Sequence, residues 1–314
     1  MTAKCCLCGN NGSSLVDKIK TSDITKIYMH LFSVNIDKYF NESESIFYYR
    51  CNVCDLLFFS PPVSGDEQFY DHLQQFEWYY TKNKEEFVFA EQFIKPDDHV
   101  LEVGCGGGWF GKILEPCNYL GLEVNTKAKL IANKNMQNVI IQTVEDHAIN
   151  SRELYDVVCS FQVLEHVVNP ESFVRSCVDC LKPGGLLILS VPSEDSYLAI
   201  VEDGILNMPP HHLTRWTDKT LTWMANRFNL EIISLKHEPL ADIHVHAYAT
   251  EMIRALIKRI FHQKFEIIST TVPHRFLTYI CQILGKYYST ILSNPGLRPV
   301  GHSVTMVLKK VTHL

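Results

Sequence analysis

The stretch His99–Val124, HVLEVGCGGGWFGKILEPCNYLGLEV, decides the fold of this chain. It opens with the short run Val100–Val103, whose length and β-branched residues predict a buried parallel strand. Glycines crowd the next positions, where a ligand can approach the main chain without a Cβ in the way. The segment Trp109–Leu114 then predicts a helix whose first N–H groups point back at the glycine turn.

A second apolar run, Tyr119–Leu122, ends in an acid at Glu123. An acid at the end of the second strand is placed to accept hydrogen bonds from the hydroxyls of a ribose. Strand, glycine turn, helix, strand and acid together predict a nucleoside-binding half-fold. Gly106, Gly108 and Gly111 also satisfy a G-x-G-x-x-G template, so a dinucleotide is one alternative, and a glycine turn that serves only packing is another.

Glu102, two positions before the first glycine, discriminates between the nucleosides. A carboxylate there would repel a pyrophosphate, but it would attract the ammonium of S-adenosylmethionine (SAM), directly or through a water. Glu102 therefore argues against an NAD-dependent oxidoreductase and favours SAM.

The segment E-V-G-C-G-G-G resembles motif I of the class I SAM-dependent methyltransferases. The resemblance implies an α/β fold with a seven-stranded, mostly parallel, Rossmann-like sheet. It also implies a cofactor site at Glu102, Gly104, Cys105 and Gly106, which hold the amino acid part of SAM, and at Glu123 for the ribose. In this family the turn after the third strand meets the adenine. Here that turn is Thr143–Asp146, and we assign Val144 and Glu145 to the site, with Asp146 or merely exposed charges as alternatives.

Tyr155–His166 resembles family motif IV, D-V-V…L-E-H, and predicts a fourth strand. Strands of open α/β sheets end at the ligand crevice, so we expect Gln162 near the sulfonium. His166 either bridges a loop and a helix by hydrogen bonds or transfers a proton.

The loop NMPPHHLTRWT, Asn207–Thr217, places adjacent histidines after two prolines. Methyl transfer to carbon or to a hydroxyl needs the acceptor's proton removed, and a neutral imidazole does this near pH 7. We therefore assign catalysis to His211 and His212, with His166 as a further candidate. In the alternative, one histidine caps Thr214 or a helix end and the other is exposed.

Cys5-x-x-Cys8 and Cys51-x-x-Cys54 predict a closed four-sulfur zinc site with a structural role, and redox chemistry at one pair is the alternative. A zinc knuckle followed by an aromatic, proline-containing segment (Phe69, Tyr70, Phe76, Trp78, Tyr79, Tyr80) is similar to the zinc-ribbon-bearing sugar and natural-product C-methyltransferases.

We expect five parts in the chain. These are a zinc-binding module (1–62), an aromatic connector and helix (63–98), the SAM-binding core (99–240), a helical cap insertion (241–298) and a last core strand (299–314). The last strand, Ser303–Lys310, is expected at the antiparallel edge of the sheet. In the insertion, a helix over Glu251–Phe261 is expected to carry Ile253, Leu256, Ile257 and Ile260 on one face and Arg254, Lys258 and Arg259 on the other.

The composition of the chain indicates its class, its partners and its compartment. The 314 residues are 46% hydrophobic with a net charge of −6, which is ordinary for a globular chain and demands no nucleic acid partner. The N-terminus has no apolar signal region and the eleven cysteines are an odd number, so we expect a cytoplasmic protein with reduced thiols. The cap is expected to pack on the core, with a dimer face or a lipid-docking surface as alternatives, in a monomer or homodimer.

The predicted function is methyl transfer from SAM to a small-molecule acceptor, such as a sugar nucleotide, a carbohydrate or another metabolite. A non-catalytic zinc scaffold that only binds SAM is the alternative outside enzymology.

Overall fold

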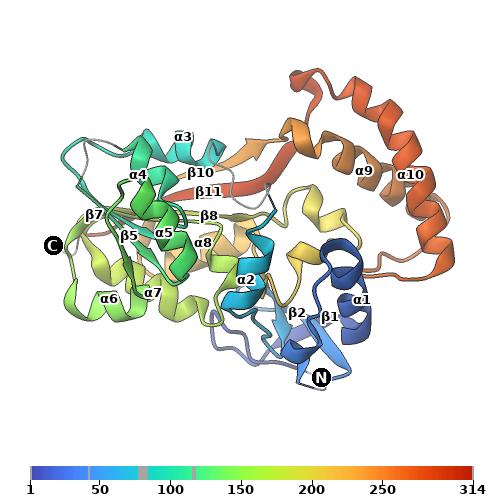
Figure 1. Ribbon diagram of the computed structural model, residues 1–314, viewed down its shortest axis with the longest axis horizontal. Coiled ribbons are helices and arrows are strands. Elements are labelled where there is room, and N and C mark those ends of the chain that lie inside the picture. Colours follow the sequence, from blue (N-terminus) through green and yellow to red (C-terminus); the bar gives the residue numbers. More distant parts are fainter. Residues whose placement is uncertain (1, 42, 77–83, 115–117, 313–314) are drawn as a thin grey trace.

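The computed structural model describes residues 2–41, 43–76, 84–114 and 118–312. Seven strands form its central sheet in the order β10-β11-β8-β7-β4-β5-β6 (Figure 1). The pairs from β8 to β6 are parallel, and β11 is antiparallel to both of its neighbours. The strands are β4 (His99–Val103), β5 (Asn118–Glu123), β6 (Val139–Ile141), β7 (Tyr155–Phe161), β8 (Leu181–Pro192), β10 (Leu230–Pro239) and β11 (Val300–Lys310). The predicted α/β, mostly parallel sheet is confirmed.

Helices connect these strands and end at the boundaries that their capping residues set. Asn125, Thr143, Asn169 and Thr217 each accept a backbone N–H in the first turn of the following helix. The helices are α3 (Glu85–Glu91), α4 (Trp109–Ile113), α5 (Thr126–Lys134), α6 (Val144–Asn150), α7 (Pro170–Cys180) and α8 (Asp218–Arg227). Short 3-10 turns are η1 (Asp37–Phe40), η2 (Leu164–His166), η3 (Tyr197–Ile200), η4 (Ile205–Asn207), η5 (Asp242–His244) and η6 (Pro295–Leu297).

The position expected for the last strand is wrong. β11 lies between β8 and β10, and β10 forms the edge of the sheet. The sequence of β11 explains this, because Val304, Met306, Val307 and Leu308 are fully buried, as befits a strand with a neighbour on each side. The edge strand β10 is mostly exposed or half-buried along its length.

A second sheet, of four antiparallel strands, is built mainly from the N-terminal part of the chain. Its order is β1 (Ser13–Lys20), β2 (Ser45–Cys51), β3 (Leu57–Ser60) and β9 (Thr214–Arg215). Helices α1 (Thr21–Phe32) and α2 (Glu67–Leu73) pack with it around a separate core that contains Tyr28, Phe59 and Phe69. Because β9 begins two residues after His212, this sheet fixes the histidine loop to the N-terminal part of the chain.

Two helices, α9 (Val245–Ile260) and α10 (Val272–Ile291), pack side by side at one end of the molecule (Figure 1). Helix α9 buries two of the cations expected on its basic face and exposes two residues of its apolar face. Arg254 and Lys258 are 4% and 8% exposed, whereas Leu256 and Ile260 are 57% and 61% exposed. The two cations are buried because the buried Glu202 pairs with both, at 3.8 Å from Arg254 Nη1 and 2.6 Å from Lys258 Nζ. Over the described residues, no helix has the length and apolar character needed to cross a bilayer.

Candidate active site

A cavity of about 700 Å³ opens at the carboxyl ends of β4, β5 and β7. All eleven residues predicted for cofactor binding or catalysis line it: Glu102, Gly104, Cys105, Gly106, Glu123, Val144, Glu145, Gln162, His166, His211 and His212. The chain therefore brings the glycine turn and the histidine loop, more than a hundred residues apart, to the same hollow.

The glycine turn is tight because two successive N–H groups share one acceptor. Gly104 and Cys105 donate to the carbonyl of Leu122 at 2.8 and 3.0 Å. Gly104 has φ of 73°, and a Cβ there would lie 2.4 Å from a methyl carbon of Val163. Only glycine satisfies both conditions, so this position is fixed by the backbone and by the neighbouring loop.

Glu102 lies buried on the floor of the cavity. Its Oε2 accepts a hydrogen bond of 2.5 Å from the hydroxyl of Tyr119. Burial raises the pKa of Glu102 to about 8, because a charged carboxylate loses its hydration there. The site therefore holds a protonated acid at neutral pH that a cationic ligand would ionise.

Glu123 is held by the backbone around it. Oε2 accepts from the N–H of Gly106 at 2.8 Å, and Oε1 accepts from Val124 and Asn125 at 2.7 and 2.8 Å. A carboxylate has about four acceptor positions. These hydrogen bonds join the end of β5 to the glycine turn. They leave one acceptor position of the carboxylate for a further donor, such as a ribose hydroxyl.

Gln162 follows β7 with φ of 58°. Its side-chain amide donates to Glu86 Oε2 at 2.8 Å and lies 3.2 Å from Ser190 Oγ and 3.1 Å from Ser303 Oγ. Glu86, on α3, is itself buried and also accepts from Ser190. The sequence analysis missed Glu86, which holds Gln162 at the cavity wall.

The segment expected to be an adenine-facing turn is the start of α6. Thr143 caps this helix by accepting the N–H of Asp146 at 3.2 Å, and it also hydrogen-bonds the Asp146 carboxylate at 3.0 Å. Of the two acids left open by the sequence, Glu145 lines the cavity. Asp146 is engaged in the cap.

Three histidines form a cluster on the other wall of the cavity. His166, His211 and His212 have ring centroids 4.5 to 4.7 Å apart. His211 and His212 are both buried, which contradicts the alternative in which one of them is exposed. Burial lowers the pKa of His166 to about 4 and the pKa values of the other two well below the usual range, so all three rings are neutral at pH 7.

The Nδ1 atom of each ring is held by an oxygen that can only accept. His166 Nδ1 donates to the carbonyl of His211 at 2.6 Å, so His166 bridges η2 and the histidine loop. His211 and His212 donate to Leu206 O at 2.8 Å and to Asn207 Oδ1 at 3.0 Å. Each tautomer is thereby fixed with the lone pair on Nε2.

Two further residues complete this wall. Glu165 is 1% exposed, and its Oε1 lies 3.7 Å from His166 Nε2 and 3.8 Å from His212 Nε2. The hydroxyl of Tyr70 lies 3.3 Å from His166 Nδ1. The L-E-H pattern marked Glu165 in the sequence, whereas Tyr70 was one of several aromatics without an assigned role, and Trp78, Tyr79 and Tyr80 lie outside the described residues.

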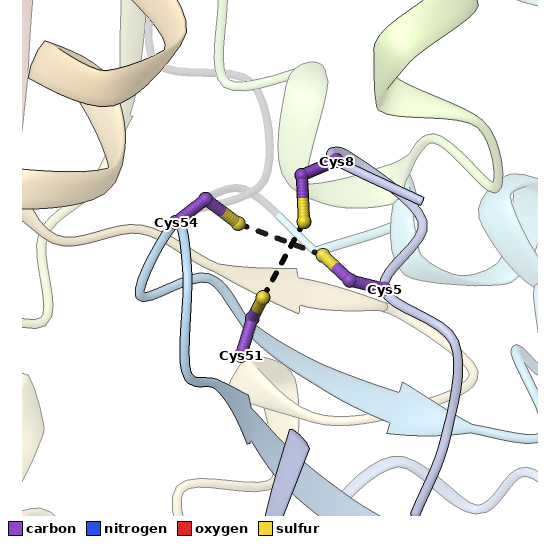
Figure 2. A group of neighbouring side chains, drawn as sticks. All are labelled: Cys5, Cys8, Cys51 and Cys54. Atoms are coloured by element: carbon purple, nitrogen blue, oxygen red, sulfur yellow. Dashed lines mark hydrogen bonds between the residues drawn. The ribbon is translucent and has the colours of Figure 1, made fainter. Parts of the chain in front are cut away.

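The four cysteines converge at the base of the N-terminal sheet, as Figure 2 shows. Their Sγ atoms lie within 4.8 Å of one another, with 3.6 Å between Cys5 and Cys54 and 3.4 Å between Cys8 and Cys51. Zinc bonds of about 2.3 Å in a tetrahedron place sulfurs about 3.8 Å apart. The donor set and its geometry therefore fit a zinc ion.

Comparison with known proteins identifies the family. A model of the methyltransferase domain matches residues 73–235, which include the glycine turn, Glu123, Gln162 and the histidine loop. The chain belongs to this methyltransferase family. The match begins within α2 and ends in β10, so the cysteine cluster and the α9–α10 pair lie outside it.

Two relatives agree with this assignment, and one solved structure shares the fold. The ubiquinone biosynthesis O-methyltransferase of Erwinia tasmaniensis is 34% identical over 167 residues, which cover 46% of this chain and 67% of that protein. The protein of the same name from Proteus mirabilis is 31% identical over 162 residues, covering 46% and 66%. A SAM-dependent methyltransferase structure from Archaeoglobus fulgidus matches 77% of this chain and all of that chain, with a TM-score of 0.51 and 16% identity.

The protein is therefore a SAM-dependent methyltransferase, and the NAD-dependent oxidoreductase is set aside. The expected similarity to sugar C-methyltransferases is not among these findings, and the residue roles stay predictions.

Proposed function

We propose that this methyltransferase transfers the SAM methyl group to an oxygen of a small molecule bound between the glycine turn and the histidine cluster. The observation that carries the proposal is the single cavity lined by both groups of residues. The name of the 34% identical relative, an O-methyltransferase of ubiquinone biosynthesis, supports oxygen as the accepting atom and a small molecule as the acceptor.

The cofactor would lie along the glycine turn. Glu102 accepts from the ammonium, directly or through a water, and the backbone of Gly104, Cys105 and Gly106 borders the amino acid part. Glu123 accepts from a ribose hydroxyl. Val144 and Glu145, at the start of α6, border the adenine, and Gln162 lies toward the sulfonium. SAM carries its own leaving group, so the protein contributes mainly orientation.

The acceptor would lie against His166, His211 and His212. Its oxygen attacks the methyl carbon in line with the carbon–sulfur bond, that bond breaks, and S-adenosylhomocysteine leaves with the electron pair. The proton of the hydroxyl passes to a neutral imidazole Nε2 in the cluster. Because each Nδ1 already carries a proton, Nε2 is the ring nitrogen that can accept the proton of the hydroxyl.

The four cysteines would hold a structural zinc ion. They share one hydrophobic core with the central sheet, through Leu7, Tyr49 and Phe58. Zinc there would stabilise the N-terminal sheet and, through β9, the position of the histidine loop.

The test measures SAM binding by calorimetry and then SAM turnover with a panel of phenols, sugar nucleotides and hydroxylated metabolites. We expect binding, and turnover with at least one hydroxylated acceptor that His212→Ala lowers by about 100-fold or more while SAM affinity stays the same. Tight binding without turnover on any acceptor would instead support the scaffold alternative.

A further inference from the structure

We propose that His166, His211 and His212, together with the carboxylate of Glu165, form a binding site for a divalent first-row transition-metal ion on the acceptor side of the cavity. One ring nitrogen from each of the three histidines lies within 4.8 Å of the others. The site is separate from the four-cysteine cluster, and it would be the second metal site of the chain.

The hydrogen bonds of the three rings are those of metal-binding histidines. Such a histidine donates its second ring N–H to a carbonyl or carboxylate, which fixes the tautomer and orients the lone pair toward the metal. Here all three rings do so, with acceptors at His211 O, Leu206 O and Asn207 Oδ1. Packing alone would not require the same tautomer in all three rings.

Glu165 supplies the independent observation. Both of its carboxylate oxygens are buried, and neither accepts a hydrogen bond from another residue that the structure describes. A buried carboxyl that no other side chain satisfies is costly, which favours a cationic partner from outside the polypeptide.

The distances suit one ion shared by these groups. Donors about 2.1 Å from a metal lie about 3.0 to 4.2 Å from each other. The separations of Glu165 Oε1 from His166 Nε2 and His212 Nε2, 3.7 and 3.8 Å, fall in this range. Imidazole and carboxylate together suit Mn²⁺, Fe²⁺, Co²⁺ or Zn²⁺.

A metal at this place would select the acceptor, an extension that rests on the proposed function. Four protein donors leave a six-coordinate ion two open positions, and all four residues line the cavity. The acceptor class is then a molecule with two neighbouring oxygens, such as a catechol or a hydroxy acid. In the metal-loaded protein the metal would lower the pKa of the acceptor hydroxyl and the proton would pass to water, so the proton transfer to an imidazole proposed above applies to the metal-free protein.

The experiment titrates the zinc-loaded full-length protein with Co²⁺ and follows visible absorption, which needs no knowledge of the acceptor. We expect one saturable equivalent whose spectrum lacks strong thiolate charge-transfer bands. His166→Ala and Glu165→Gln should each weaken binding, the histidine variant by more than about 100-fold, beyond the 10- to 100-fold cost of losing an outer partner. His302→Ala, at another histidine of the cavity wall, should bind Co²⁺ as the wild type does.

Three results would overturn the proposal: no Co²⁺ binding by the wild type, thiolate bands alone, or equal binding by the variants. If His166→Ala fails to fold, anomalous diffraction from wild-type crystals soaked in Co²⁺ decides, because the proposal requires a peak between the three rings. Loss of the metal site would leave SAM binding intact, so failure here is distinguishable from failure of the proposed function.

Discussion

The cavity wall and the α9–α10 pair both bury carboxylates, but they neutralise them differently. Behind α9, Glu202 accepts from Lys258 Nζ at 2.6 Å and from the N–H of Glu266 at 2.8 Å, and Arg254 and His274 lie within 3.8 Å. In the cavity, Glu102 has a tyrosine hydroxyl as its nearest described donor, and Glu165 has none within hydrogen-bond distance.

The difference separates structural acids from binding acids. A buried acid whose cation comes from the same chain is satisfied on folding and holds helices together. A buried acid without such a cation has a raised pKa in the free protein. A cationic ligand can then pair with it and favour its ionised form.

The largest effect is expected when the pairing behind α9 is broken. Lys258→Met leaves Glu202 buried with its closest cation removed, and this should cost about 3 to 5 kcal/mol of unfolding free energy. Denaturant unfolding measures the loss. In the double variant Lys258→Met with Glu202→Gln part of the stability should return, and no recovery would show that the pair is not the cause.

Removing the ionisable carboxyl at the floor of the cavity should affect binding instead of stability. Glu102→Gln deletes a charge-assisted hydrogen bond to the ammonium, so SAM affinity should fall by about 10- to 100-fold. The melting temperature should stay within about 2 °C of the wild type, because no internal ion pair is lost. Calorimetry that finds unchanged affinity would remove Glu102 from the cofactor site.

The pH dependence of binding sharpens the same contrast. The pKa of Glu102 is raised to about 8, so below pH 8 the free protein holds a proton that the ammonium must displace. SAM affinity should rise by up to about tenfold per pH unit between pH 6 and 8 and then level off, with proton release seen in buffers of different ionisation enthalpy. In Glu102→Gln this component should vanish, and a profile identical to that of the wild type would assign the titration elsewhere.

The smallest effect is expected two residues before Lys258. Leu256 is exposed, so Leu256→Glu should change the unfolding free energy by less than about 0.5 kcal/mol. A loss of several kcal/mol would mean that α9 packs through the apolar face that contains Leu256.

The sequence predicted the sheet and the cavity where local rules dominate. Gly104 has a positive φ and lies close to Val163, and an acid ends β5. At each of these positions the type of residue alone indicates its role. The same holds for the capping residues Asn125 and Thr217, which mark helix starts almost to the residue.

Long-range pairing could not be predicted in this way. The burial of Arg254 and Lys258 on α9 depends on Glu202, more than forty residues before the helix, and the periodicity of the helix does not reveal that partner. Glu86 and Tyr119 show the same limit, since each is recognised only through the side chain that it contacts. The insertion of β11 between β8 and β10 likewise follows from the hydrogen-bonded register of distant strands.

The most direct test of the account is a crystal structure of the protein with SAM bound. We predict the ammonium within about 3.5 Å of the Glu102 carboxylate or joined to it by one water, a ribose hydroxyl on Glu123, and the methyl group directed toward the histidine cluster. A cofactor bound with its ammonium away from Glu102, or with its methyl group turned from the histidines, would contradict it.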